Sequence, residues 1–223
     1  MAKKDKYRCQ ADLTQKVIHE TVEKLPRNCG KLFLRKFTID KKKNRLTQKN
    51  EHKNQVKNTS KKETDLTHDP THACCFTGHR DLPQNLIPQL RAQMYAELEK
   101  LYSFFGVKTF ISGGAIGFDL LAAETVLELK RAHPEIKLIF ALPCENHTKN
   151  WGDAATMKFR MLSLLADNTV YVSQNYYNGC MHVRNKFMLE HSEFCICYCK
   201  KTSGGSYYTL CAAKKMNKTI IEL

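Results

Sequence analysis

A glycine-rich turn, FISGGAIGFD at residues 110–119, is the first segment whose residue types point to chemistry. Three glycines fall within five residues after a short apolar run: Gly113, Gly114 and Gly117. Glycine permits a positive φ and a close approach of a ligand to the backbone, and a helix start presents N–H groups that bind anions. Ser112 and these glycines therefore favour a phosphate site, with a plain tight turn as the alternative. Asp119 fits either a first-turn acid or a contact to a ribose hydroxyl.

A second glycine turn, KTSGGSYYT, occupies residues 201–209. Its N–H and hydroxyl donors could hold a phosphate, and they come from Ser203, Gly204, Gly205 and Ser206. Two such turns on one edge of a sheet favour a site for two phosphates, or for a phosphate and a sugar. Neither turn has the Walker A lysine or the GxGxxG spacing, so P-loop ATP hydrolysis and an ordinary nicotinamide fingerprint are not indicated.

Further polar residues recur after other apolar runs. The segment TGHR supplies four candidate ligand-binding residues: Thr77, Gly78, His79 and Arg80. The planar guanidinium of Arg80 suits a phosphate, and His79 is either a titrating group or an exposed loop histidine.

Two later segments add candidates for the same site. In GCMHVRNKFM, Arg184 stands in the first turns of a predicted helix and faces either the site or solvent. The segment PCENHTKNW contains Glu145 and the only tryptophan, Trp151, which would act as a lid, stack on a base or pack in the core.

These residues need a scaffold, and from residue 72 onward apolar runs alternate regularly with helix-like segments. Six strands are expected, at 73–78, 107–112, 136–143, 169–173, 194–199 and 218–223. Five helices are expected between them, at 88–106, 118–134, 155–167, 180–192 and 206–217. Such alternation predicts an α/β fold with a mostly parallel sheet covered on both faces. In such a sheet all the polar loops named above follow strand ends, so they would surround one cleft.

Composition separates the chain into two parts. The net charge is +14, and residues 1–70 hold 19 Lys+Arg against 9 Asp+Glu. We expect a basic, largely disordered extension and linker over 1–71 and a folded domain over 72–223. The extension is a candidate contact for nucleic acid or an anionic surface, or it is simply solvated.

The remaining expectations concern compartment and cysteines. No apolar run approaches the roughly 18–20 residues of a membrane span, and no secretory signal is evident, so a cytoplasmic location is expected. Ten cysteines include no CxxC pair. The cluster CICYC at residues 195–199 fits a buried strand, with a metal or redox role as the alternative. No metal site and no cofactor are expected.

The motifs TGHR, ISGGAIGFDLLAAE, LIFALPCENHTKNW, YYNGCMHVRNKFML and TSGGSYYTLCAAKKMNKTII resemble, in order, the YpsA-like branch of the SLOG superfamily. The resemblance covers residues 74–223. It implies a Rossmann-like three-layer sandwich that binds nucleotides or their derivatives. The superfamily includes the lonely-guy phosphoribohydrolases and DNA-processing protein A.

The segment SGGAIGFD is similar to the SGxAxGxD turn of the DNA-processing proteins. MHVRNKFM is similar to the MHxRKxxM helix of the phosphoribohydrolases and places Met181, His182 and Arg184 on that pattern. In those enzymes this arginine and a glutamate after the second glycine turn cleave an N-glycosidic bond. Here no acid occurs from residue 203 to 210, and Glu145 or Asp119 would have to substitute.

Our first expectation is therefore a sensor or regulatory module that binds a nucleoside phosphate, ADP-ribose or an NAD-like molecule. The alternatives are an N-glycosidic hydrolase with Arg184 and Glu145 as catalytic residues, and a single-stranded nucleic-acid binder. A homo-oligomer is left open.

Overall fold

The computed structural model describes residues 69–223. The predicted extension and linker over 1–71 lies outside the described residues except for its last three positions. There, the side chain of Asp69 accepts a hydrogen bond from the backbone N–H of Thr71 and caps a short 3₁₀ helix, η1 (Pro70–His72).

Six strands and five α-helices alternate along the described residues, as expected. The strands are β1 (Ala73–Gly78), β2 (Thr109–Ser112), β3 (Lys137–Leu142), β4 (Asn168–Tyr171), β5 (Phe194–Tyr198) and β6 (Thr219–Glu222). The helices are α3 (Ile87–Phe105), α4 (Phe118–Ala132), α5 (Asp153–Leu165), α6 (Cys180–Glu190) and α7 (Gly205–Lys215). A second 3₁₀ helix, η2 (Gln84–Leu86), leads into α3 and was not predicted.

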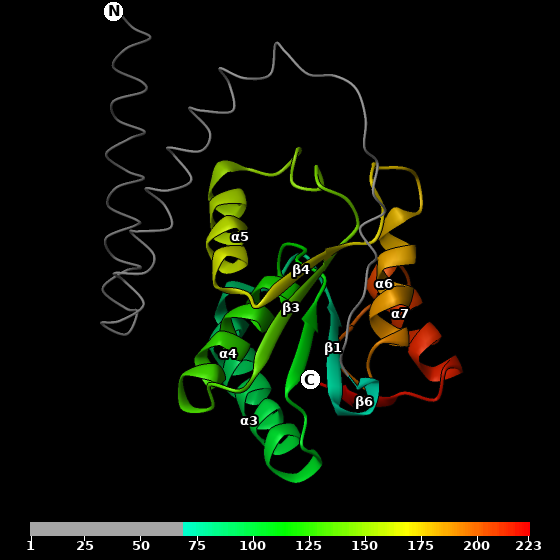
Figure 1. The fold of residues 1–223 in the computed structure, drawn as a ribbon. Coiled ribbons are helices and arrows are strands. Elements are labelled where there is room, and N and C mark those ends of the chain that lie inside the picture. Colours follow the sequence, from blue (N-terminus) through cyan, green and yellow to red (C-terminus); the bar gives the residue numbers. More distant parts are fainter. Residues whose placement is uncertain (1–68) are drawn as a thin grey trace, which may run out of the picture. The chain divides into compact units, whose positions relative to one another are not determined.

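All six strands form one parallel sheet in the order β4-β3-β2-β1-β5-β6. The chain moves outward from β1 to β4 and then returns to β5, which pairs with the other side of β1 (Figure 1). The order therefore reverses beside β1. In open α/β sheets this reversal point, at the carboxyl ends of the strands, is where ligands bind.

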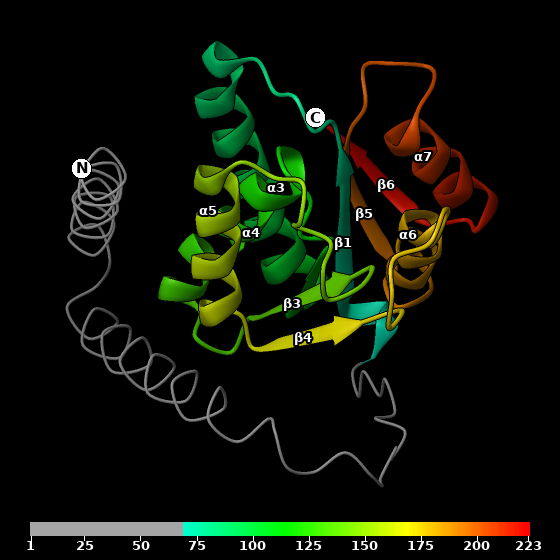
Figure 2. The same ribbon diagram turned by 90° about the horizontal axis from the view of Figure 1, so that it is seen from above.

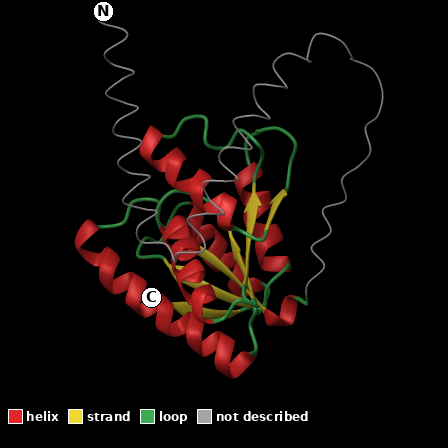
Figure 3. Ribbon diagram, turned by 60° about the vertical axis from the view of Figure 1, so that its left-hand side comes forward, coloured by secondary structure: helices red, strands yellow, loops and turns green. Residues whose placement is uncertain are grey.

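The helices cover both faces of the sheet. Helices α3, α4 and α5 lie on one face and α6 and α7 on the other (Figure 2). The fold therefore has three layers, with strands between helices (Figure 3). The larger apolar core lies under α3–α5 and includes Phe76, Phe110 and Phe140. A smaller core lies under α6 and α7, around Cys75 and Cys195. The α/β, Rossmann-like three-layer fold is thus confirmed.

Helix α3 shows why the sequence pattern was informative. Leu90, Met94, Leu98 and Leu101 recur at spacings of three and four, and all four are buried. The helix ends at Gly106, which has φ 65° and satisfies the last turn in a left-handed conformation.

Strand β5 contains all of the CICYC cluster except its last cysteine. Cys195 and Cys197 are buried in the strand, whereas Cys199 lies beyond its end and is partly exposed. Among residues 69–223, no three His, Cys, Asp or Glu side chains are grouped as a metal ion would require.

Within the described part of the chain, no helix combines the length and apolar character needed to cross a membrane.

Candidate functional site

None of the five α-helices in the described residues has a side-chain cap at its start. In three of them the residue that precedes the first turn is a glycine with positive φ: Gly117 (85°) for α4, Gly179 (100°) for α6 and Gly204 (88°) for α7. A serine, threonine or aspartate at this position would normally accept an N–H bond of the first turn. At α4 and α6 backbone oxygens take part of this role, because Phe118 N–H donates to His79 and Cys180 N–H donates to Tyr177. At α7 no such bond is found among the described residues, so its first-turn N–H groups remain open to water or to a ligand.

A buried ion pair lies at the carboxyl edge of the sheet. Arg184 Nη1 stands 3.3 Å from Asp119 Oδ2, and the two side chains are 5% and 8% exposed. Arg184 reaches this place because Cys180, Arg184 and Met188, spaced by four, form the buried face of α6. Asp119, in the first turn of α4, also accepts a hydrogen bond from the backbone N–H of Ala115 at 3.3 Å.

The two charges oppose the effect of burial. Loss of water raises the pKa of Asp119 and lowers that of Arg184, while each partner's opposite charge acts in the other direction. Arg184 is also buried at Nε, where it has no hydrogen-bond partner among the described residues. A cation is therefore held at the carboxyl edge with part of its donor capacity unused.

Gly113 makes room for this arginine. A Cβ at Gly113 would lie 1.3 Å from Arg184 Nη1 and 2.6 Å from Asp119 Oδ2. The next residue, Gly114, has φ 65°, and its Cβ would approach a ring carbon of Phe159 to 3.1 Å. Protein side chains thus already account for the two glycines. Their contact with a phosphate stays a prediction.

The start of α4 packs tightly against the loop after β1. A Cβ at Gly117 would lie 2.1 Å from the backbone oxygen of Arg80, and a Cβ at Gly78 would lie 2.4 Å from the ring of Phe118. Ser112 Oγ donates to the backbone oxygen of Asp119 at 2.9 Å. These contacts fix the loops after β1 and β2 against each other.

His79 joins three of the loops. Its backbone oxygen accepts a hydrogen bond from Phe118 N at 3.1 Å, and its Nε2 accepts one from the backbone N–H of Lys200 at 2.8 Å. Its ring packs edge-on against Tyr198. Burial, followed by the charge of Lys201, lowers the pKa of His79, which favours the neutral ring that can accept.

The backbone of the loop after β5 is accessible to solvent. Ser203, Gly204 and Gly205 are exposed, and a Cβ at either glycine would meet nothing within 4 Å. Ser206 Oγ donates to the backbone oxygen of Gly78 at 2.6 Å, which ties the start of α7 to the end of β1. This is the most accessible of the predicted anion sites.

Glu145 lies elsewhere on this edge. It is exposed in the loop after β3. Burial raises the pKa of Tyr171, at the end of β4, and the charge of Glu145 raises it further. The carboxylate that pairs with Arg184 is Asp119.

The family model of the YspA SLOG family matches residues 74–221. The chain belongs to this family. Uncharacterized SPbeta prophage-derived protein YoqJ of Bacillus subtilis is 29% identical over 139 residues, which are 57% of this chain and 81% of YoqJ. A UPF0398 protein of Ligilactobacillus salivarius is 34% identical over 98 residues, 43% of this chain and 52% of that protein. The chain thus spans about half the length of this UPF0398 relative.

DNA processing protein A (DprA) from Streptococcus pneumoniae has a similar fold. Its TM-score is 0.51 at 15% identity, over 67% of this chain and 49% of DprA. At this identity the likeness extends to the fold alone.

In this member of the YspA SLOG family, several predicted residues do lie together. The ion pair joins α4 to α6, and the bonds of His79 and Ser206 join the loops after β1 and β5. Thr77 is buried near the end of β1, and Arg80 is exposed in the loop that follows.

His147 is a further candidate site residue, which the sequence did not single out. It sits between the rings of Phe159, at 4.8 Å, and Trp151, at 5.4 Å. Trp151 is therefore packed against its own loop. His147 Nδ1 donates to the backbone oxygen of Cys144 at 3.1 Å, and its Nε2 is buried without a hydrogen-bond partner among the described residues. The only sequence signal was its place in a polar loop after a strand.

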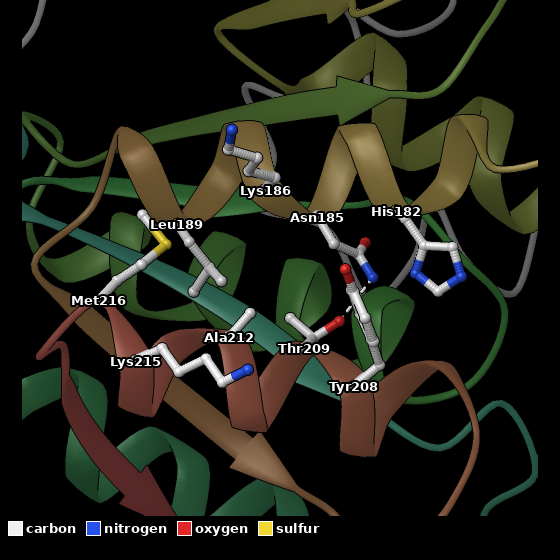
Figure 4. Close-up of a pocket in the computed structure, with 9 residues that line it drawn as sticks. All are labelled: His182, Asn185, Lys186, Leu189, Tyr208, Thr209, Ala212, Lys215 and Met216. Atoms are coloured by element: carbon white, nitrogen blue, oxygen red, sulfur yellow. Dashed lines mark hydrogen bonds between the residues drawn. The ribbon is translucent and has the colours of Figure 1, made fainter.

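A groove of about 210 Å³ runs between α6 and α7 (Figure 4). At one end the rings of His182 and Tyr208 meet at 4.5 Å, and Asn185 donates to Thr209 Oγ1 at 2.7 Å. Lys186, Leu189, Ala212, Lys215 and Met216 line the rest.

Proposed function

We propose that this domain binds a nucleoside phosphate or a related molecule, such as ADP-ribose or an NAD-like dinucleotide, at the carboxyl edge of its sheet. The domain then acts as a sensor or regulatory module. The observation that carries the proposal is the buried Arg184–Asp119 pair beside three helix starts that follow positive-φ glycines.

The phosphate is assigned to the start of α7. Gly204 and Gly205 leave the backbone open there, and the helix dipole favours an anion. Exposed Lys200 and Lys201 stand in the same loop, and exposed Arg80 follows the neighbouring β1. These cations add to the positive potential that a phosphate would meet.

The positions of the carboxylates Asp119 and Glu145 favour binding of the ligand without cleavage. The carboxylate of Asp119 already bonds Arg184 and Ala115 N–H, and Glu145 stands beside Tyr171. No acid occurs in the loop after β5 or the first turns of α7. The site thus supports recognition better than attack on an N-glycosidic bond.

A melting experiment on the full chain tests the proposal. ADP-ribose, NAD and AMP are added separately, and a ligand at about 100 times its Kd adds about 2.7 kcal/mol of stability. Gly205→Asp places a negative charge in open space at the start of α7 and should abolish the shift. Asn217→Asp adds the same charge beyond the other end of α7 and should retain it.

The result also separates the alternatives. A shift with release of free base, seen by chromatography, would assign the N-glycosidic hydrolase instead. No shift with any of the three ligands, or an equal shift in Gly205→Asp, would contradict the proposal.

Single-stranded nucleic acid is a second candidate, favoured by one surface observation. From residue 168 to 221 the only acids are Glu190 and Glu193. Five exposed tyrosines lie in the same stretch: Tyr171, Tyr176, Tyr177, Tyr207 and Tyr208. Aromatic side chains among cations suit stacked bases and a phosphate backbone. Oligonucleotide binding that weakens steeply with salt, and that competes with AMP, would support this candidate.

A further inference from the structure

Two buried side-chain nitrogens lack a hydrogen-bond partner among residues 69–223: His147 Nε2 and Arg184 Nε. Buried polar atoms are nearly always bonded, because an unpaired one loses its water without replacement. An unpaired atom at a ligand site is therefore a candidate contact for the ligand. One of these two is an acceptor and the other is a donor.

The role of His147 follows from its other nitrogen. Because the backbone oxygen of Cys144 can only accept, Nδ1 must carry the proton, and Nε2 presents a lone pair. Burial lowers the pKa of His147, and the nearby Arg184 charge lowers it further, so the neutral ring is favoured. The rings of Phe159 and Trp151 hold the imidazole in place.

The two side chains flank the same turn. Arg184 lies over Gly113, and the Phe159 ring that packs on His147 lies over Gly114. Two buried cysteines also link the two side chains. The backbone oxygen of Cys144 accepts the hydrogen bond from His147. Burial raises the pKa of the Cys144 thiol, and Cys180, which stands one helical turn before Arg184, raises it further.

We infer that His147 Nε2 and Arg184 Nε together hold the ribose hydroxyls of the ligand, one hydroxyl donating to the imidazole and its neighbour accepting from the guanidinium. This assignment rests on the proposed function, and it names the sugar as the part of the ligand that these two side chains recognise. Asp119, a candidate for the ribose contact in the sequence, instead positions Arg184 through their 3.3 Å bond.

Binding of three probes by the full chain tests this inference: AMP, 2′-deoxy-AMP and 3′-deoxy-AMP. AMP should bind about tenfold more tightly than each deoxy analogue, the value of about one hydrogen bond. His147→Phe keeps the ring packing and removes the acceptor, so it should bind AMP and the analogue that lacks the hydroxyl facing His147 equally, both as weakly as the unaltered protein binds that analogue. It should keep the preference for AMP over the other analogue, which lacks the hydroxyl facing Arg184. His147→Gln should restore part of the preference.

His133→Phe is the matched control, since His133 ends α4 at the opposite edge of the sheet and packs on Tyr102. It should leave the preference unchanged. Equal binding of AMP and both analogues by the unaltered protein would overturn the inference and leave the proposed function intact. The inference would also fall if His147→Phe kept the preference for AMP over both analogues. If the protein binds none of the three probes and no other nucleotide, both proposals fail.

Discussion

Arg184 and Asp119 form the most constrained contact of the site. Removing one partner of a buried ion pair strands the other charge away from water, which typically costs about 3–5 kcal/mol. Arg184→Ala should therefore lower the free energy of unfolding by an amount of this order, measured by urea denaturation. Replacing both residues, as in Asp119→Leu with Arg184→Met, should cost less than the single change. A loss below about 1 kcal/mol for Arg184→Ala would show that water reaches Asp119.

At the residue scale the sequence pattern singled out candidate positions but not the contacts between them. Gly113, Asp119 and Arg184 were each singled out. The contact between the last two, 65 residues apart, was not, because it depends on how α6 crosses back over the sheet. His147 was missed because a single loop histidine has no periodic signal.

At the scale of elements, His79 links the loop after β5, which contains the exposed Gly204, to the loops after β1 and β2. Its neutral ring accepts the N–H of Lys200. The pKa of His79 is lowered from its ordinary value of 6.5, chiefly by burial. The unfolded chain therefore takes up this proton more readily than the folded one. The stabilisation by His79 is therefore complete above pH 6.5, and it is lost as the pH falls through the pKa that His79 has in the folded protein.

Urea unfolding of the unaltered protein and of His79→Leu from about pH 8 to about pH 5 measures this effect. The difference between the two proteins should be largest above pH 6.5 and should shrink below it. Because His147 is present in both proteins, its own titration cancels. A difference that is independent of pH would show that the ring acts only by packing on Tyr198.

The order of elements was predictable, since each helix has one apolar face and each strand is a short apolar run. Helix α3 was predicted at 88–106 and is found at Ile87–Phe105. The short 3₁₀ helix Gln84–Leu86 was not predicted, because its three residues carry no periodic pattern and none of them is buried.

At the scale of the whole molecule, the reversal of strand order beside β1 explains why the candidate binding residues lie at one edge of the sheet. Helix α4 lies on one face of the sheet and α6 and α7 lie on the other (Figure 2), and all three follow strands that end at this edge. Alternation along the sequence predicted the layers. It could not predict which loops would face each other, because loop contacts depend on side-chain packing.

The most direct test of a nucleotide site at this edge is a titration of the isotopically labelled full chain with ADP-ribose, followed by the backbone amide resonances. The largest changes should fall at Gly204, Gly205 and Ser206, with further changes at Ala115 beside the ion pair. Changes confined to the groove between α6 and α7, at Lys186 and Met216, or no changes at saturating ADP-ribose and NAD, would contradict the account.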